Sequence, residues 1–161
     1  MAQRVLITGA TRGLGLGMAR HFAARGYALA LTGRKQEELD QLQNELAGEE
    51  PVITRVLEIT DYDAVALCIR ECASEFCGLD IVVANAGVGV NTPTGDGSFD
   101  TIRQTIDLNI TGAIATCEAA IELFREQGHG QLVGITSVAK LRGNRGQSAY
   151  CSSKAAVSVY L

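Results

Sequence analysis

The sequence has few prolines and no extended apolar run. Its two prolines, Pro51 and Pro93, fall between the expected helices and strands, and there is no linker, internal repeat, low-complexity segment or charge block. No apolar stretch reaches the ~18 residues that a membrane-spanning helix needs. The 161 residues therefore predict one domain, 1–161, that does not span a membrane.

No secretory leader is expected, because the first residues, MAQRVLITGA, enter a short apolar segment without a basic start or a cleavage site. The five cysteines show no paired short spacing, which suits free thiols in a reducing compartment. Cys68 and Cys72 lie one helical turn apart, and without a nearby histidine we expect them to be packing residues. A cytoplasmic protein is expected.

Histidine is scarce, and the charge balance is acidic. With only two histidines the sequence offers no His-based metal spacing, so we expect no metal site. His21 falls inside an expected helix, where a packing role is favoured, and His129 falls in a loop after a helix. The net charge of −4 and the pI near 5.2 argue against a nucleic-acid-binding surface.

Short apolar runs alternate with longer segments of helical period. The strand-like runs cover 4–8, 28–32, 52–59, 79–84 and 131–136, and the helical segments cover 14–25, 35–47, 63–76, 99–126 and the residues from 148 on. Each crossover between parallel strands is right-handed and needs a helix. The order predicts a Rossmann-like, doubly wound α/β fold with three layers, α/β/α, and strand order 3-2-1-4-5.

A glycine-rich turn follows the first expected strand and reads Thr8-Gly9-Ala10-Thr11-Arg12-Gly13-Leu14-Gly15. Glycines at such a turn let the backbone approach a pyrophosphate, whose charge the unpaired N–H groups at the helix start attract. The spacing is TGxxxGxG, not the general GxGxxG fingerprint. We predict a dinucleotide site made by Gly9, Thr11, Arg12, Gly13, Leu14 and Gly15; an ordinary tight turn is the alternative.

No acidic residue follows the second expected strand, where NAD-preferring folds place one on the ribose hydroxyl. Arg34 occupies that position, and Arg12 precedes the second glycine of the turn. Because a guanidinium matches a phosphate bidentately, the two arginines predict a site for a 2′-phosphate, with NADP(H) preferred over NAD(H). A solvated loop residue is the alternative for Arg34.

Tyr150 and Lys154 lie four residues apart in an expected helix, so they project from the same face and can act on one ligand. Ser137 lies thirteen residues before Tyr150, and Asn109 lies in the preceding long helical segment. An ammonium one turn from a phenol favours the phenolate, which proton exchange near neutral pH requires. Taken alone, a tyrosine and a lysine at this spacing are usually two polar surface residues, so the chemical meaning of the pair depends on the other motifs.

These features, in their order and approximate spacing, resemble the simple, single-domain branch of the short-chain dehydrogenase/reductase family. The resemblance covers essentially the whole chain and rests on the glycine turn, Asn85-Ala86-Gly87 after the fourth expected strand, Asn109, Ser137, Tyr150 and Lys154. It implies an NADP(H)-dependent oxidoreductase acting on a carbonyl or alcohol substrate. Epimerisation or dehydration on the same cofactor is the alternative chemistry.

The resemblance also implies individual roles. Tyr150 would be the general acid or base, Ser137 would hydrogen-bond the substrate oxygen, Lys154 would also hold the nicotinamide ribose, and Asn109 would hold a water. Asp61 would hydrogen-bond the adenine amino group, although helix N-capping also explains an aspartate there. Asn85, Ala86 and Gly87 would lie against the cofactor. A homodimer or homotetramer is implied as well.

The family fold continues beyond a fifth strand with further strands and a lid over the substrate, which this sequence lacks. Its last segment, SAYCSSKAAVSVYL, carries no glycine or proline stop signal, so we expect a chain truncated inside a helix. The alternative is a complete chain that acts as a catalytically poor nucleotide-binding or oligomerising remnant. The segments 88–100 and 138–147 should border the substrate pocket.

Overall fold

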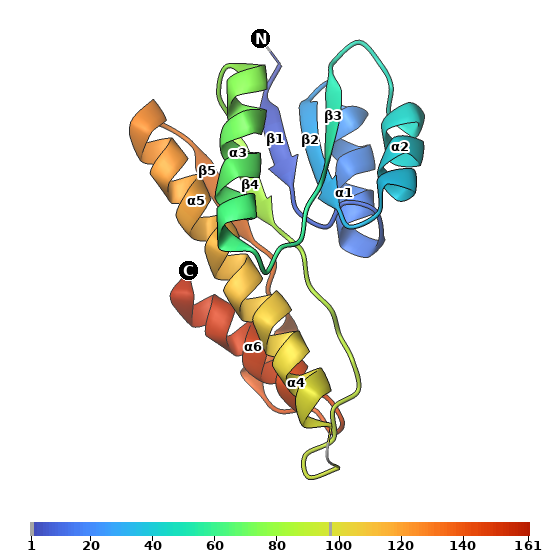
Figure 1. The fold of residues 1–161 in the computed structure, drawn as a ribbon, viewed down its shortest axis with the longest axis vertical. Helices are drawn as coiled ribbons and strands as arrows, with labels where there is room; N and C mark the ends of the chain where they lie inside the picture. The colour runs from blue at the N-terminus through green and yellow to red at the C-terminus, as the bar shows by residue number, and fades with distance from the viewer. Residues whose placement is uncertain (1, 97) are drawn as a thin grey trace.

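A computed structural model describes residues 2–96 and 98–161. Strands and helices alternate along this part of the chain, as Figure 1 shows. The strands are β1 (Arg4–Ile7), β2 (Ala28–Gly33), β3 (Val52–Val56), β4 (Ile81–Ala84) and β5 (Gln131–Gly134). The helices are α1 (Gly13–Ala23), α2 (Gln36–Glu45), α3 (Tyr62–Phe76), α4 (Phe99–Ile106), α5 (Gly112–Gln127) and α6 (Ser148–Tyr160), with a π-helical turn η1 (Asp107–Thr111) and a 3₁₀ turn η2 (Val138–Leu141).

The five strands form one sheet in the order β3-β2-β1-β4-β5, and all neighbouring pairs are parallel. The predicted order is therefore confirmed. The register places Leu6 opposite Ala30 of β2 and opposite Val82 of β4. The strand order reverses between β1 and β4, which is the position where doubly wound sheets bind ligands at their carboxyl ends.

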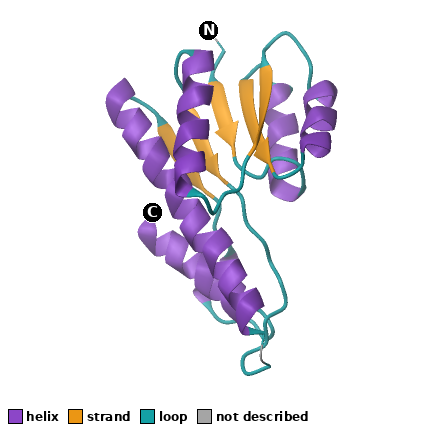
Figure 2. Ribbon diagram, viewed as in Figure 1, coloured by secondary structure: helices purple, strands orange, loops and turns teal. Residues whose placement is uncertain are grey.

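Alternate residues of each strand supply the two cores, which explains the three layers in Figure 2. Leu6, Ala30 and Val82 face α3 and α5 together with Ile69 of α3. The intervening residues face α1 and α2: Val5, Ile7, Leu29, Leu31 and Val83. The predicted α/β/α architecture is confirmed, and it follows from the near-continuous apolar strands that a sheet covered on both faces requires.

Most elements agree with their expected bounds to within two residues, and two differ more. Strand β3 ends at Val56 rather than at residue 59, so Glu58 leaves the strand and comes to its carboxyl end. The long helical segment from residue 99 is interrupted by η1, where Asp107–Thr111 form one π turn between α4 and α5. π turns are rare and occur frequently at functional sites.

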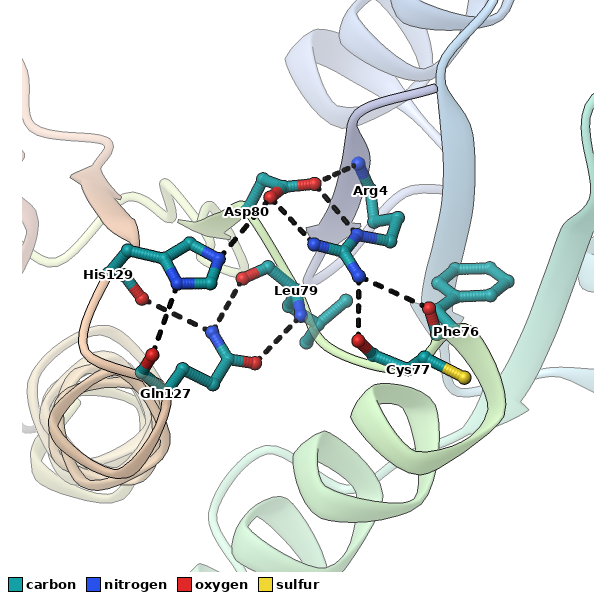
Figure 3. A network of polar contacts seen from close by, with 7 residues as sticks. All are labelled: Arg4, Phe76, Cys77, Leu79, Asp80, Gln127 and His129. Atoms are coloured by element: carbon teal, nitrogen blue, oxygen red, sulfur yellow. Dashed lines mark hydrogen bonds and ion pairs between the residues drawn. The ribbon is translucent and has the colours of Figure 1, made fainter. Parts of the chain in front are cut away.

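A polar network closes the amino end of the sheet (Figure 3). Arg4 donates from Nη2 to Asp80 Oδ1 at 2.8 Å, from Nε to Asp80 Oδ2 at 2.8 Å, and from Nη1 to the Cys77 carbonyl at 2.7 Å. Gln127 accepts from the Leu79 amide and donates to the Leu79 carbonyl, both at 2.9 Å. The network ties β1, the end of α3, the start of β4 and the end of α5 together.

Helices α4 and α6 extend beyond the carboxyl ends of the strands, at the lower end of the molecule in Figure 1. The loop after β4 descends beside them, and α4 packs against α6. This end of the molecule therefore collects the glycine turn, the loop after β4 and the start of α6. The residues predicted to carry chemistry lie here.

Candidate active site at the carboxyl edge of the sheet

The glycine turn leaves the first turn of α1 open to an anion. Gly9 and Gly13 have φ angles of +67° and +57°, which glycine adopts without steric cost. Arg12 is the N-cap of α1 but makes no side-chain capping hydrogen bond, and no acidic residue lies in the first turn. The amides at the start of α1 therefore lack a side-chain acceptor, and the helix dipole favours negative charge there.

Gly15 lies where α1 touches the start of the turn. An ideal Cβ built on Gly15 would come within 2.2 Å of the Gly9 carbonyl oxygen and 2.6 Å of Asn85 Nδ2. The same construction on Gly9 reaches Ala86 Cα at 3.0 Å. Close packing of the turn on the segment after β4 is the physical reason for glycine at both positions.

Side chains from β1 and β4 bind the turn to the Asn85-Ala86-Gly87 segment. The Thr8 hydroxyl oxygen accepts from the Asn85 amide at 3.0 Å and from the Ala86 amide at 3.1 Å. Asn85 Nδ2 donates to the carbonyl oxygens of Thr8 and Gly9 at 2.8 and 3.0 Å. The structure thus brings these two predicted segments together at the point where the strand order reverses.

A cleft of about 570 Å³ opens between the carboxyl ends of β2, β3 and β4 on one side and α4 with the π turn η1 on the other. Its lining residues are Arg34, Glu58, Thr60, Val88, Val90, Thr101, Gln104, Thr105, Asp107, Leu108 and Thr111. Arg34 and Glu58 line the cleft, and Asp61 is not among the lining residues. The Asp61 carboxylate caps α3, because its Oδ1 accepts from the Ala64 amide at 3.0 Å, and its Oδ2 is a second acceptor.

Charged side chains gather beside the glycine turn at the end of β2. Glu38 of α2 accepts from Lys35 Nζ at 2.7 Å. The pKa of the Glu38 carboxyl is lowered, mainly by the Lys35 ammonium and to a smaller extent by the Thr11 hydroxyl and the Arg12 charge. Arg34 and Arg12 form no ion pair with a carboxylate within 4 Å in the residues that the structure describes.

Helix α6 carries the predicted Tyr150/Lys154 pair. Lys154 is 6% exposed. Its Nζ donates at 2.8 Å to the carbonyl of Ile135, the residue directly after β5. Burial lowers the pKa of the Lys154 ammonium. An ideal Cβ on Gly87 would lie 3.4 Å from Lys154 Nζ and 3.3 Å from Asn109 Oδ1, so these predicted residues also meet.

Asn109 lies in the π turn and is fully buried. Its Oδ1 accepts from the Val88 amide and its Nδ2 donates to the Val88 carbonyl, both at 2.8 Å. Nδ2 also donates to Ser153 Oγ at 3.0 Å, and Ser153 donates to the Tyr150 carbonyl at 2.8 Å. Both amide hydrogens of Asn109 are therefore committed to the protein, and the residue links the loop after β4 to α6.

Ser137 is half-buried just beyond β5, at the N-cap of η2. Its hydroxyl oxygen accepts from the Ala139 amide at 3.1 Å, which leaves the hydroxyl hydrogen able to donate. Val138 and Leu141 lie next to it with exposed fractions of 83% and 77%. Ser137 thus presents a donor beside an apolar surface at the same edge as Tyr150.

Two site residues escaped the sequence reasoning. Glu58 was expected inside a strand, and only the early end of β3 brings it to the cleft. Ser153 is fully buried between Asn109 and Tyr150, and a serine inside a helix carries no local sign of such a bond.

Two further properties concern residues 2–96 and 98–161 alone. No group of three or more His, Cys, Asp or Glu side chains in these ranges is arranged to hold a metal ion. None of the helices there combines the length and apolar character needed to cross a bilayer.

The parallel sheet, the glycine turn at its switch point and the side chains around α6 define a dinucleotide-binding α/β domain of the Rossmann type. The sequence model of the short chain dehydrogenase family matches residues 3–161. The chain belongs to this family, as the motifs indicated.

Similarity to individual proteins extends over nearly the whole chain. An uncharacterized oxidoreductase of Mycobacterium tuberculosis is 39% identical over 159 residues, which cover 96% of this chain and 63% of the relative. The crystal structure of an NAD⁺-bound xylitol dehydrogenase matches with a TM-score of 0.93 at 27% identity, covering 98% of this chain and 62% of that one.

An alcohol dehydrogenase from Thermococcus sibiricus, in complex with 5-hydroxy-NADP, matches with a TM-score of 0.92 at 30% identity, covering 99% of this chain and 68% of that one. Among the curated relatives it matches, the chain spans somewhat under two thirds of their length, for example 63% and 62%.

Proposed function

We propose that this chain is the nucleotide-binding and catalytic part of an NADP(H)-dependent oxidoreductase that transfers hydride between nicotinamide and a small carbonyl or alcohol substrate. The observation that carries the proposal is the convergence of Lys154, Asn109 and Gly87 within a few ångströms, beside the glycine turn that Asn85 binds. Family membership supports the reaction class.

The residues of the turn fit a dinucleotide. Uncapped amides at the start of α1 suit a pyrophosphate, and the glycines keep side chains out of its path. Arg34 lines the cleft and Arg12 is the N-cap residue of α1. Both would bind a 2′-phosphate, and this role is our reason for proposing NADP(H) over NAD(H). Solved relatives hold either kind of cofactor, so the arginines are the argument for this preference.

Bound nicotinamide would supply or accept the hydride. Tyr150 donates a proton to the carbonyl oxygen during reduction and takes it back during oxidation. Ser137 donates a hydrogen bond to the same oxygen as negative charge develops there. Lys154 stabilises the Tyr150 phenolate and holds the ribose hydroxyls. Asn109 holds α6 against the loop after β4, and any water it binds would use the free lone pair of its Oδ1 or its backbone.

The surroundings of the protein follow from the same proposal. The exposed apolar residues Val138 and Leu141 would border a small-molecule substrate. By analogy with the family we also propose a cytoplasmic homodimer or homotetramer.

Three variants test the proposal with the intact chain. Thermal denaturation with NADPH and with NADH should show the larger stabilisation by NADPH, because a ligand that binds only the folded state raises its stability. Arg34→Ala should weaken the binding of NADPH much more than the binding of NADH. Arg25→Ala is the matched control, since Arg25 is an exposed arginine just after the far end of α1, where its side chain bonds His21.

Tyr150→Phe tests the chemistry separately from binding. It should abolish the oxidation of NADPH by a panel of small aldehydes and ketones while leaving NADPH affinity nearly unchanged. Turnover that survives in Tyr150→Phe would refute the acid–base assignment, and equal losses of NADPH and NADH in Arg34→Ala would refute the role of Arg34.

A further inference from the structure

Thr92 connects the loop after β4 to the first residues of α6, although 56 residues separate them in sequence. It is fully buried. Its amide donates to the Gly146 carbonyl at 2.8 Å, and its carbonyl accepts from the Ser148 hydroxyl at 2.6 Å. Its own hydroxyl oxygen accepts from the Ala149 amide at 3.2 Å. One residue therefore binds three successive parts of the segment that leads into α6.

Helix α6 needs this contact because it lacks a cap of its own. Its N-cap residue, Gln147, makes no side-chain capping hydrogen bond. The first amides of a helix have no partner inside the helix and are normally satisfied by a Ser, Thr, Asp or Asn at the N-cap. The Thr92 hydroxyl satisfies the Ala149 amide from a different part of the chain. Tyr150 is the next residue.

The loop that carries Thr92 is held at both ends. At its start, Asn109 binds the amide and the carbonyl of Val88. In its middle, Gly89 faces the Tyr150 ring: an ideal Cβ there would lie 3.6 Å from Tyr150 Cδ2. At its end, Thr92 holds α6. Residues 88–92 thus run along the tyrosine between two hydrogen-bonded anchors.

We infer that Thr92 is a positioning residue of the active site, which sets the place of the Tyr150 side chain by capping α6 from the loop after β4. The inference rests on the proposed function of Tyr150. Thr92 is not among the residues that line the cleft, and its hydroxyl bonds the Ala149 amide, so its effect passes through the start of α6.

The test compares Thr92→Val, which keeps the shape but removes the hydroxyl, with Thr92→Ser, which keeps the hydroxyl. Thr116→Val is the matched control, because Thr116 is equally buried and its hydroxyl donates to the Gly112 carbonyl within α5. We expect Thr92→Val to lower kcat at least tenfold with little change in the KM for NADPH. Thr92→Ser and Thr116→Val should stay close to wild type.

A second measurement needs no turnover. The NMR resonances of the Tyr150 ring, assigned by their loss in Tyr150→Phe, should shift in Thr92→Val and not in Thr92→Ser. If Thr92→Val fails to fold, Ser148→Ala removes only the bond to the Thr92 carbonyl and should give a smaller shift in the same direction.

The outcomes separate the two proposals. A wild-type chain without turnover, combined with Tyr150 ring resonances that Thr92→Val shifts, refutes the proposed reaction and supports the positioning role. An active wild type with an equally active Thr92→Val, or unshifted ring resonances, overturns the role of Thr92. Failure of Thr92→Ser to restore both readouts overturns it as well.

Discussion

Replacing Gly15 by alanine should damage the fold and the nucleotide site together. The new Cβ would lie 2.2 Å from the Gly9 carbonyl oxygen and 2.6 Å from Asn85 Nδ2, closer than real Cβ atoms approach such groups. Both neighbours are held in place, because Asn85 Nδ2 donates to Gly9 and Thr8. The turn must therefore move away from α1 or lose these bonds.

The magnitude follows from three effects. Overpacking of a rigid contact typically costs about 1–3 kcal/mol. Loss of the two Asn85 hydrogen bonds costs about 1 kcal/mol each. The higher helix propensity of alanine offsets about 1 kcal/mol. We expect Gly15→Ala to lower the free energy of unfolding by about 3 kcal/mol.

Gly17 is the matched control, since it lies in the same helix and an ideal Cβ there meets nothing within 4 Å. Gly17→Ala should be neutral or stabilising by up to about 1 kcal/mol. Urea denaturation should separate the two midpoints by more than about 1 M, because slopes for small proteins are about 1–3 kcal/mol/M. NADPH should stabilise Gly17→Ala but not Gly15→Ala. Equal midpoints and equal NADPH effects would show that the close packing of the turn does not matter.

Three further changes test other parts of the molecule. Asp80→Asn removes the carboxylate whose pKa Arg4 lowers, so it should lower the free energy of unfolding by about 2 kcal/mol at pH 7. It should also flatten the loss of stability that wild type shows as the pH falls below about 4. Urea denaturation at pH 7 and below pH 4 measures both effects. Glu38→Gln removes negative charge beside the glycine turn and should raise NADPH affinity several-fold with a smaller effect on NADH, measured by fluorescence titration. Ile69→Ala should lower stability by about 2–4 kcal/mol, whereas exposed Leu67→Ala should change it by less than about 1 kcal/mol, measured by thermal unfolding.

The sign of the Asp80 prediction follows from its depressed pKa in the folded state. An aspartate in the unfolded chain titrates near 3.9, so the stabilisation is complete above that value and disappears as pH falls through the lower, folded pKa. A variant without the carboxylate has no such contribution to lose. An acid unfolding curve in Asp80→Asn as steep as that of wild type would contradict this explanation.

The sequence was sufficient for the layers and for the edge of the sheet at which the predicted site residues lie. Apolar strands covered on both faces imply helices on both sides, and parallel strands bring their carboxyl ends to one edge. This rule alone places the glycine turn, Asn85 and Ser137 together. The structure adds that Gly87, Asn109 and Lys154 approach one another closely.

The rest depends on features without a local signature. The π turn at Asn109 lies in a segment whose apolar pattern fits one continuous helix, so the periodicity of the sequence cannot reveal it. Glu58 was hidden because β3 ends three residues earlier than its apolar run suggested. Thr92 makes its side-chain bonds across 57 residues, and a threonine in a loop looks the same whether it is buried or exposed.

The core of the sheet and its carboxyl edge are specified by different means, and this bears on how variants should behave. Apolar alternation defines the sheet and its helices, so core substitutions should lower stability and leave the geometry of the carboxyl edge intact. That edge is held by side chains that bond the backbone of another segment: Thr8, Asn85, Thr92 and Asn109.

Each of these bonds satisfies a polar group that would cost about 1–3 kcal/mol if left buried and unpaired. The penalty applies only when the partner loop is displaced, so the bonds select one arrangement of the loops around Tyr150. Substitutions at these four positions should therefore change kcat out of proportion to their effect on stability, whereas core substitutions of equal destabilising effect should not.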